Sequence, residues 1–386
     1  MLFMEQTTQR IRLLDILRGI AVLGTLGTNI WIFAYLGSLA PLFTIDHSPW
    51  ESLNEFLRVL VLFLVNGKFL GLLTILFGAG LELKYRQSVR NGKHWPGMYL
   101  WVSVFLIMEG LLHFILVMEY DILMSYGVAA IIVSFIVGTG DRSVKIAFRV
   151  FGGVHAIFML PILVGGIVLH FTSAGFTMGS LRESMALYQE GAWIDQVKYR
   201  LDQFLYLRSE AIFILPMNIF LMLLGVRFMR SGVFSDTQAG RVYRRKLLRI
   251  GLFAGIPLNL LIFIPGGAFD FPVRYLFAPI MSIGYLAIFA KIVERHGDWK
   301  IWSWLENAGR MSLSCYVLQN TLATFTFYGW GLGLGLRLNS AGIVLVWLVI
   351  AMLQMLFAKA WLTAFNQGPM EASRRRAIGL LERKSV

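Results

Sequence analysis

The segment AGIVLVWLVIAMLQMLFAKAWLT, residues 341–363, decides the class of fold, because Lys359 is its only charged residue. A helix of about 20 apolar residues is long enough to cross the hydrocarbon core of a membrane. Similar apolar blocks recur along the chain between clusters of charged residues, which predicts about ten transmembrane helices. The expected spans are 13–36, 56–81, 98–118, 122–140, 147–171, 209–229, 248–265, 273–292, 308–329 and 341–363.

The composition excludes an ordinary soluble domain. Of the 386 residues, 57% are hydrophobic and 15% are charged, whereas the exterior of a soluble protein of this length needs more polar surface. We therefore expect an all-α integral membrane protein that forms a single multi-pass domain over residues 1–386. Its N-terminal helices occupy residues 1–171 and its C-terminal helices residues 209–386, and an external segment, residues 172–208, joins them.

The distribution of Lys and Arg predicts which helix ends face the cytoplasm. Basic residues gather in alternate loops, and the loops between them are acidic or neutral, so both termini are expected on the cytoplasmic side. This bias also accounts for the formal net charge of +13. Since no basic soluble domain or arm is present, we expect the lipid bilayer, and not nucleic acid, as a partner. The basic residues concerned are Arg10, Arg12, Lys84, Arg86, Arg90, Lys93, Arg142, Lys145, Arg149, Arg241, Arg244, Arg245, Lys246, Arg249, Arg374, Arg375 and Arg376.

Two segments depart from plain spans. The second apolar block contains Arg58 and the sequence Asn66-Gly67-Lys68, which predicts a broken or re-entrant helix whose freed backbone groups are covered by protein or water. Residues 172–208 mix charged residues with aromatic and aliphatic ones, which predicts short amphipathic helices at the outer interface. A lid over an outward-facing site is the alternative for this segment.

Polar residues in the first apolar block are candidates for function, because a charge at membrane depth needs a partner or a task. Asp15 and Arg18 lie on one face of the helix and can neutralise each other. Alternatively, the planar guanidinium of Arg18 can bind phosphate. Asn29 follows eleven residues later, roughly 16 Å along the helix axis. An Asn at this depth serves helix packing more often than catalysis.

His47 lies in the next external loop, beside carboxylates. A solvated histidine is the simple interpretation, and a general base or acyl carrier is the functional one, because His changes its charge near neutral pH. Lys68 can neutralise a bound anion or extend to an interface. His113 and Asp121 bracket the end of the third span, where a buried, hydrogen-bonded histidine is the simple interpretation.

No metal or haem site is expected. The sequence contains no GxxxxGK(S/T), CxxC or HExxH motif, and its histidines do not pair at matching helix positions. Cys315 is the only cysteine. The chain therefore has no disulfide framework, and we interpret Cys315 as a packing residue.

Five ordered motifs give the sequence a family resemblance: RIRLLDILRGIAVLGTLGTNI (10–30), NGKFLGLLTILFGAG (66–80), GLLHFILVMEYDILMSYG (110–127), AGRMSLSCYVLQNTLATFTFYGWGLGL (308–334) and NQGPMEASRRR (366–376). With them the chain resembles the YeiB-like bacterial membrane proteins, whose C-terminal half is described as a domain of unknown function, number 418. The resemblance extends over essentially the whole chain. It implies a multi-pass protein of the bacterial cytoplasmic membrane.

Through this family the chain is similar to a wider group of transmembrane acyltransferases, which includes the lysosomal heparan-α-glucosaminide N-acetyltransferase and the acyltransferase family 3 enzymes. Arg18 matches an arginine of the family 3 enzymes, and Asn29 stands where they carry a catalytic histidine. Asn29 and His47 are also similar to an asparagine and a catalytic histidine of the lysosomal enzyme. Near the C-terminus, Gln319 stands where that enzyme carries a histidine.

The resemblance implies a membrane-bound O- or N-acyltransferase that moves an acyl group, with acetyl as the expected one, from cytoplasmic acyl-CoA to an envelope glycan, lipid or metabolite. Acyl-CoA would be the donor substrate, and no tightly bound cofactor is expected. A transporter or exporter of a small metabolite or lipid is the alternative, since a broken helix and buried charge also suit a carrier. A non-catalytic ligand-binding relative is a third reading. A homodimer is compatible with each of them.

The candidate site residues fall into three groups. His47 and Asn29 are assigned to catalysis, His47 as base or acyl carrier and Asn29 as a hydrogen-bond donor to the developing oxyanion. Arg18, Asp15 and Lys68 are assigned to binding the donor. The residues assigned to the substrate are His113, Asp121, Tyr126, Arg310 and Gln319.

Overall fold

The computed structural model describes residues 11–45, 48–172 and 182–384, and all regular elements within them are helical. The α-helices are α1 (Arg12–Ala34), α2 (Leu53–Val65), α3 (Lys68–Arg90), α4 (Tyr99–Leu116), α5 (Leu123–Gly138), α6 (Asp141–Thr172), α7 (Arg182–Glu190), α8 (Trp193–Asp202), α9 (Phe204–Leu207), α10 (Ala211–Arg230), α11 (Gln238–Ile250), α12 (Ile256–Asn259), α13 (Asp270–Pro272), α14 (Ala278–Arg295), α15 (Ile301–Arg310), α16 (Ser312–Phe327), α17 (Ser340–Ala364) and α18 (Pro369–Lys384). Short 3₁₀ turns η1 (Ala40–Leu42) and η3 (Leu260–Phe263) and π-helices η2 (Gly251–Gly255) and η4 (Val273–Phe277) complete them.

Eight helical segments in the described part of the chain are long and apolar enough to cross a membrane, against about ten expected from the sequence. The other two expected spans correspond to α5 and α16, which have 16 residues each. In addition, α16 follows α15 after the single residue Met311. The expected span 308–329 is therefore interrupted near its start. The eight segments are Arg12–Ala34, Leu53–Arg90, Tyr99–Leu116, Asp141–Thr172, Ala211–Arg230, Gln238–Phe263, Asp270–Arg295 and Ser340–Ala364.

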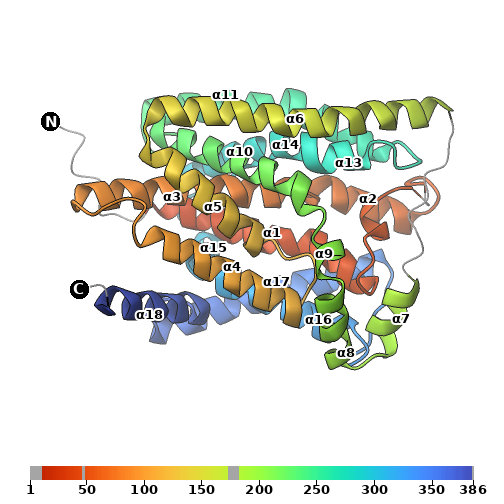
Figure 1. Ribbon diagram of the computed structural model, residues 1–386. Helices are drawn as coiled ribbons and strands as arrows, with labels where there is room; N and C mark the ends of the chain where they lie inside the picture. Colours follow the sequence, from red (N-terminus) through yellow and green to blue (C-terminus); the bar gives the residue numbers. More distant parts are fainter. Residues whose placement is uncertain (1–10, 46–47, 173–181, 385–386) are drawn as a thin grey trace.

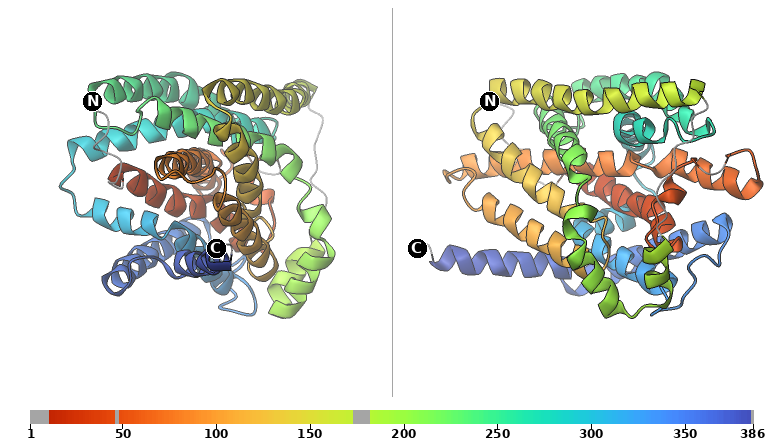
Figure 2. Two further views of the ribbon diagram at one scale, coloured as in Figure 1. Left: turned by 60° about the vertical axis from the view of Figure 1, so that its left-hand side comes forward. Right: turned by 45° about the vertical axis from the view of Figure 1, so that its right-hand side comes forward.

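The long helices run in roughly one direction and are stacked in layers (Figure 1). On one side lie α6, α10, α11 and α14, on the opposite side lie α16, α17 and α18, and α1 and α3 run between them (Figures 1 and 2). The window of α1 that would cross the membrane is 83% buried, whereas the corresponding window of α6 is 18% buried. The first helix is therefore the core of the bundle, and α6 presents an apolar face outward.

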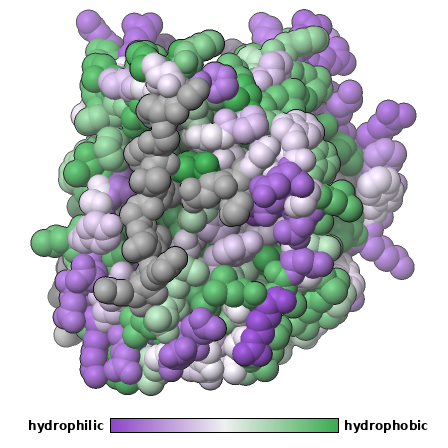
Figure 3. Space-filling model, turned by 90° about the vertical axis from the view of Figure 1, so that its right-hand side faces the viewer, coloured by the Kyte–Doolittle hydropathy of each residue, from purple (hydrophilic) through white to green (hydrophobic). Residues whose placement is uncertain are grey.

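The start of α1 and the end of α18 lie at the same end of the bundle, where α3 and α10 also end (Figure 1). The opposite end carries polar side chains interleaved with apolar ones (Figure 3). The basic loops that follow α3 and α10 thus share an end with both terminal helices.

The predicted break in the second span is confirmed. Helix α2 ends at Val65, α3 begins at Lys68, and Gly67 between them has a φ of +77°, a conformation that glycine adopts without steric cost. The backbone of the π-helix η4 lies directly against this break, because a Cβ added to Gly67 would come within 2.5 Å of the Arg274 carbonyl oxygen. Two irregular segments thus meet inside the bundle.

The predicted short helices of the external segment are present as α7, α8 and α9. They are anchored to the bundle by buried polar contacts. Arg200 donates to the Ile115 carbonyl oxygen at 2.8 Å, and its Nε lies 3.5 Å from Glu119 Oε2. Tyr188 donates to the same carboxylate at 2.9 Å. This segment therefore holds the loop that follows α4, which leads directly to Asp121.

The tightest backbone contact joins α1 to α15. A Cβ added to Gly309 would lie 1.8 Å from the Asp15 carbonyl oxygen, and one added to Gly19 would lie 2.0 Å from that of Leu305. We predict that Gly309→Ala lowers the stability of the purified protein by about 1–3 kcal/mol, because the helices must move apart. Thermal unfolding in detergent measures the effect.

Gly153→Ala is the matched control, because Gly153 lies within α6 and an added Cβ there meets nothing within 4 Å. Replacing a glycine inside a helix with alanine should leave stability unchanged or raise it by up to about 1 kcal/mol. Equal stability of the two variants would contradict the close packing of α1 on α15.

Candidate functional site

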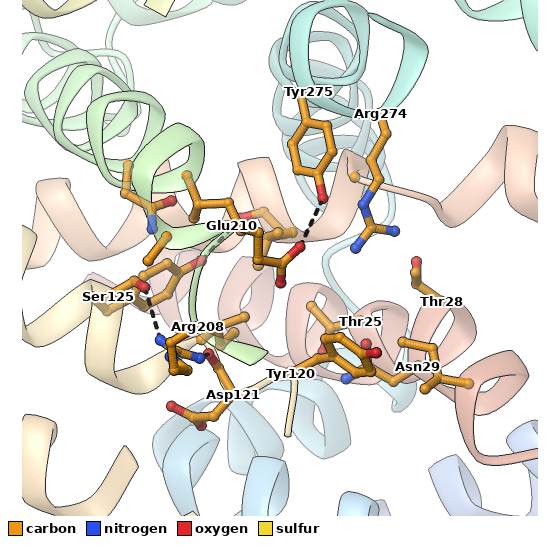
Figure 4. Close-up of a pocket in the computed structure, with 18 residues that line it drawn as sticks. Thr25, Thr28, Asn29, Tyr120, Asp121, Ser125, Arg208, Glu210, Arg274 and Tyr275 are labelled. Atoms are coloured by element: carbon orange, nitrogen blue, oxygen red, sulfur yellow. Dashed lines mark hydrogen bonds between the residues drawn. The ribbon is translucent and has the colours of Figure 1, made fainter. Parts of the chain in front are cut away.

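A polar cavity lies inside the bundle. It contains about 760 Å³ of space without atoms, part of it open to solvent, and α1, the break between α2 and α3, the start of α5, the start of α10 and η4 all contribute to its wall. Figure 4 shows the side chains around it. A polar cavity among membrane-spanning helices is costly unless its groups bind a ligand or water.

Helix α1 contributes Thr25, Thr28 and Asn29 to the cavity. These positions fall on one face of a helix because they are three or four residues apart. Asn29 makes no side-chain hydrogen bond to any residue in the described part of the chain. Its amide is therefore available to a ligand in the cavity, as the catalytic assignment requires.

Four ionisable side chains line the cavity: Arg208, Arg274, Glu210 and Asp121. Arg208 donates to the Asp121 carbonyl oxygen at 2.7 Å and to Ser125 Oγ at 3.3 Å. The guanidinium of Arg274 donates to Asn66 Oδ1 and points into the cavity (Figure 4). Glu210, at the start of α10, points into the same space and accepts a hydrogen bond of 3.5 Å from the Tyr275 hydroxyl (Figure 4).

The environment of Glu210 changes its acidity. Burial raises the pKa of the Glu210 carboxyl above its usual range, against the opposing effects of Arg274, Arg208 and the hydrogen bond from Tyr275. A carboxylate whose pKa is raised binds a proton more readily than an ordinary carboxylate does, which suits a proton acceptor.

Asp121 connects the cavity to a buried histidine. Asp121 lines the cavity, and its Oδ1 lies 3.0 Å from His113 Nδ1, with both side chains almost completely buried. The other ring nitrogen of His113 lies 3.1 Å from Asn320 Nδ2 on α16. The backbone N–H of Met124 donates to the second carboxylate oxygen of Asp121 at 3.0 Å. The predicted residues His113 and Asp121 are thus in close contact, and Asp121 lines the cavity. His113 Nδ1 and Asp121 Oδ1 have no hydrogen-bond partner in the described part of the chain.

A second chain of polar groups begins at Thr25. Gln319 on α16 donates to Thr25 Oγ1 at 3.3 Å, and Gln354 on α17 donates to Gln319 Oε1 at 3.1 Å. Tyr126 lines the cavity directly, and its hydroxyl lies 2.6 Å from Thr74 Oγ1. Gln319 therefore stands one layer behind the cavity wall, and Tyr126 belongs to the wall.

Arg18 and Asp15 lie elsewhere on α1, toward the end where the helix begins. Their side chains are 3.4 Å apart, and a Cβ added to Gly80 of α3 would lie 2.5 Å from Arg18 Nη2. Arg18 lies near Lys84 and Arg375, and Arg18 and Arg374 both lie near Tyr99. We call Arg18, Lys84, Arg374 and Arg375 the basic cluster. It is separated from the cavity along the axis of α1.

Two further assigned residues do not line the cavity. Lys68 is fully buried just after the break, and its ammonium has no hydrogen-bond partner in the described part of the chain; it lies 6.0 Å from the centre of the Phe63 ring. Arg310 ends α15 and donates to the Asn366 carbonyl oxygen at 3.5 Å. His47 lies outside the described residues.

The sequence contains signals for several cavity residues that the sequence analysis did not use. Asn218 is a polar residue inside the apolar block ILPMNIFLML, and Arg274 is a charge at the start of the eighth expected span. Arg208 and Glu210 stand at the junction of the charged external segment and the sixth span. Each is a polar group at the edge or centre of an apolar block, where burial in the membrane costs free energy. The direction in which each side chain points could not be predicted without the positions of the neighbouring helices.

Comparison with known proteins agrees with the resemblance inferred from the motifs. Residues 228–380 match the family model described as "Protein of unknown function (DUF418)". The chain carries a DUF418 domain. It is 29% identical over 389 residues to "Uncharacterized protein YeiB" of Escherichia coli (strain K12), and the aligned region covers 93% of each chain. It is also 23% identical over 387 residues to "Uncharacterized protein YxaH" of Bacillus subtilis (strain 168), which covers 95% of this chain and 93% of that protein.

The chain is therefore a full-length distant homologue of both bacterial proteins and a multi-pass membrane protein of this group. The DUF418 match falls inside the C-terminal helices 209–386 and contains Arg274, Arg310 and Gln319. Of these three, only Arg274 lines the cavity. The lining residues outside the match come from the N-terminal helices, the external segment and the start of α10. The cavity thus forms only when the two parts of the chain pack together.

The raised pKa of Glu210 gives a prediction for stability. Because its folded-state pKa is raised, this carboxyl favours the folded state at low pH, and its contribution is lost as pH rises from the ordinary carboxyl range through the raised value. We expect Glu210→Gln to unfold at a higher temperature than the wild type at neutral pH, and the advantage to shrink as pH falls toward about 4. Glu190→Gln, at an exposed position of α7, is the control. A constant difference between Glu210→Gln and the wild type at every pH would contradict the assignment.

Proposed function

We propose that this protein spans the bacterial cytoplasmic membrane about ten times, with both termini in the cytoplasm. In this arrangement α5 is one short span and the interrupted α15–α16 segment is another. The even number of spans agrees with the start of α1 and the end of α18 lying at the same end of the bundle (Figure 1). The basic loops at that end support a cytoplasmic location.

We further propose that the protein is an acyltransferase that moves an acyl group, acetyl in the simplest case, from cytoplasmic acyl-CoA to a small-molecule, lipid or glycan acceptor. One observation carries this proposal: α1 bears Arg18 in the basic cluster at one level and, in the cavity at another, Asn29, whose side chain makes no hydrogen bond to the described residues. A single helix thus links a site suited to phosphates with a site suited to an acyl carbonyl.

In this mechanism the basic cluster holds the phosphates of acyl-CoA, and the thioester extends along α1 toward the cavity. A hydroxyl or amine of the acceptor attacks the thioester carbonyl, so a C–O or C–N bond forms and the C–S bond breaks. Asn29 donates a hydrogen bond to the oxyanion of the tetrahedral intermediate. His47 accepts the proton of the acceptor group and passes it to the departing thiolate. Asp121, fixed by His113, orients the acceptor.

A transporter is the second candidate, and a specific observation favours it. The break between α2 and α3 and the π-helix η4 border the same cavity. Secondary transporters bind substrates at interrupted helices near the middle of the membrane, and π-helical turns often accompany functional sites. In this alternative the cavity residues bind a transported solute and the basic cluster has no donor role.

Radiolabelled acetyl-CoA distinguishes the two functions. We expect saturable binding to the purified protein, weakened about tenfold or more by Arg18→Ala through the loss of charge-assisted hydrogen bonds. Transfer of label to an acceptor in an extract of bacterial envelope should fall about 10²–10³-fold in Asn29→Ala, as when an oxyanion-hole donor is removed. Substrate counterflow in proteoliposomes without any thioester would support the transporter instead.

Two variants serve as controls for this experiment. Arg12→Ala removes an arginine on the same helix as Arg18, one whose side chain is 52% exposed and pairs with Glu306. Asn91→Ala removes an exposed asparagine that follows α3. Both should bind and transfer as the wild type does. Absence of acetyl-CoA binding by the wild type, or full transfer activity in Asn29→Ala, would overturn the acyltransferase proposal.

A further inference from the structure

The charged side chains of the cavity differ in how many protein partners they have. Asp121 Oδ1 lies 3.0 Å from His113 Nδ1, and its Oδ2 accepts a hydrogen bond from the Met124 N–H. Arg208 donates to the Asp121 carbonyl oxygen and to Ser125 Oγ. These groups therefore hold one another in place. Arg274 and Glu210 are the two charged groups that point toward the middle of the cavity (Figure 4).

Arg274 has donors left for a ligand. A guanidinium carries five N–H donors, and the hydrogen bond to Asn66 uses one of them. The guanidinium also lies 5.3 Å from the centre of the Tyr275 ring, which fixes its plane. A planar fork held in this way matches the two oxygens of a carboxylate or phosphate.

Two carboxamides in the same wall lack protein partners. Asn218 on α10 is 1% exposed, lines the cavity, and has an Oδ1 without a hydrogen-bond partner in the described part of the chain. Asn29 on α1 faces the same space without a side-chain hydrogen bond there. A buried amide that is left unpaired costs about 1–3 kcal/mol. The buried Asn218 and the half-buried Asn29 around one cavity suit a ligand with hydrogen-bonding groups of its own.

We propose that the cavity binds a small ligand whose carboxylate or phosphate group pairs with Arg274 and whose hydroxyl or amine groups bond to Asn29 and Asn218. Glu210 points into the same space (Figure 4), and its carboxyl oxygens can accept hydrogen bonds from the hydroxyl or amine groups of the same ligand. Under the acyltransferase proposal, on which this identification rests, the ligand is the acceptor. The acceptor is then an anionic, hydroxyl- or amine-bearing molecule.

Thiol labelling measures the sign of the electrostatic potential in the cavity, and it does not require that the ligand be known. Thr28 lines the cavity near Arg274 (Figure 4). We would introduce Thr28→Cys into a Cys315→Ala background and measure its labelling by the anionic reagent MTSES and the cationic reagent MTSET. The rate ratio of the two reagents is normalised to that for a small free thiol. We expect a ratio that favours the anionic reagent by about tenfold, since a charged cleft concentrates ions of the opposite sign by that order.

The Arg274→Gln variant should abolish this preference, and Arg274→Lys should keep part of it. Asn218→Asp adds a negative charge to the same wall and should reverse the preference. It replaces Arg274→Gln as the test if Arg274→Gln does not fold. Arg227→Gln is the control, because Arg227 also lies on α10 but stacks on Phe148 at 4.4 Å, outside the cavity lining. Its ratio should equal that of the starting protein.

Millimolar sodium acetate and inorganic phosphate then test the group that binds. We expect one or both to slow the labelling of Thr28→Cys relative to sodium chloride at equal ionic strength, and the effective anion identifies a carboxylate or a phosphate. Four outcomes would overturn the inference. In the first two, Thr28→Cys fails to label or it prefers the cationic reagent. In the other two, the preference for the anionic reagent survives Arg274→Gln, or neither anion slows the labelling. Acetyl-CoA binding is measured separately, so an anion-selective cavity without acyl transfer refutes only the acyltransferase proposal.

Discussion

The hydrogen bond from Arg274 to Asn66 is the interaction on which the rest of the site depends. It joins the break between α2 and α3 to the π-helix η4, two irregular segments that a bilayer tolerates only where protein covers their backbone. Gly67 allows the two backbones to approach, because any side chain there would meet the carbonyl of Arg274. The cavity lies where these segments meet, so its existence and the position of the Arg274 guanidinium in its wall have the same origin.

The polar groups around the cavity are organised in two layers. Groups in the wall, such as Asn29, face open space. Behind the wall, Gln319 is hydrogen-bonded to Thr25, and His113 lies in contact with Asp121. The second layer fixes the orientation of the first, which reduces the loss of side-chain freedom when a ligand binds. Because α16 supplies Gln319 and Asn320 while α1 and α4 supply their partners, this order depends on contacts between distant parts of the sequence.

Much of the fold was predictable from the sequence, and the reasons are local. The break at Asn66-Gly67 was visible as polar residues and a glycine within an apolar block, and the helices of the external segment followed from alternating polar and apolar residues. The interruption of the ninth expected span at Met311 was not predictable, because Met favours helices and the break depends on the packing of α15 against α1. Asn29, Asp121 and Tyr126, which the sequence analysis assigned to the site, line the cavity. Arg274 and Glu210 line it too but were not predicted, because their directions are set by tertiary contacts.

A double-mutant cycle on Asn66 and Arg274 tests the central claim most directly. The free energy of unfolding in mixed micelles would be measured for the wild type, Asn66→Ala, Arg274→Ala and the double variant. If their hydrogen bond joins the broken helix to η4, the single variants lose stability that the double variant loses only once. The sum of the two single losses in unfolding free energy should then exceed the loss in the double variant by about 0.5–3 kcal/mol. Additive losses would show that the two residues act independently, and this account of the cavity would be contradicted.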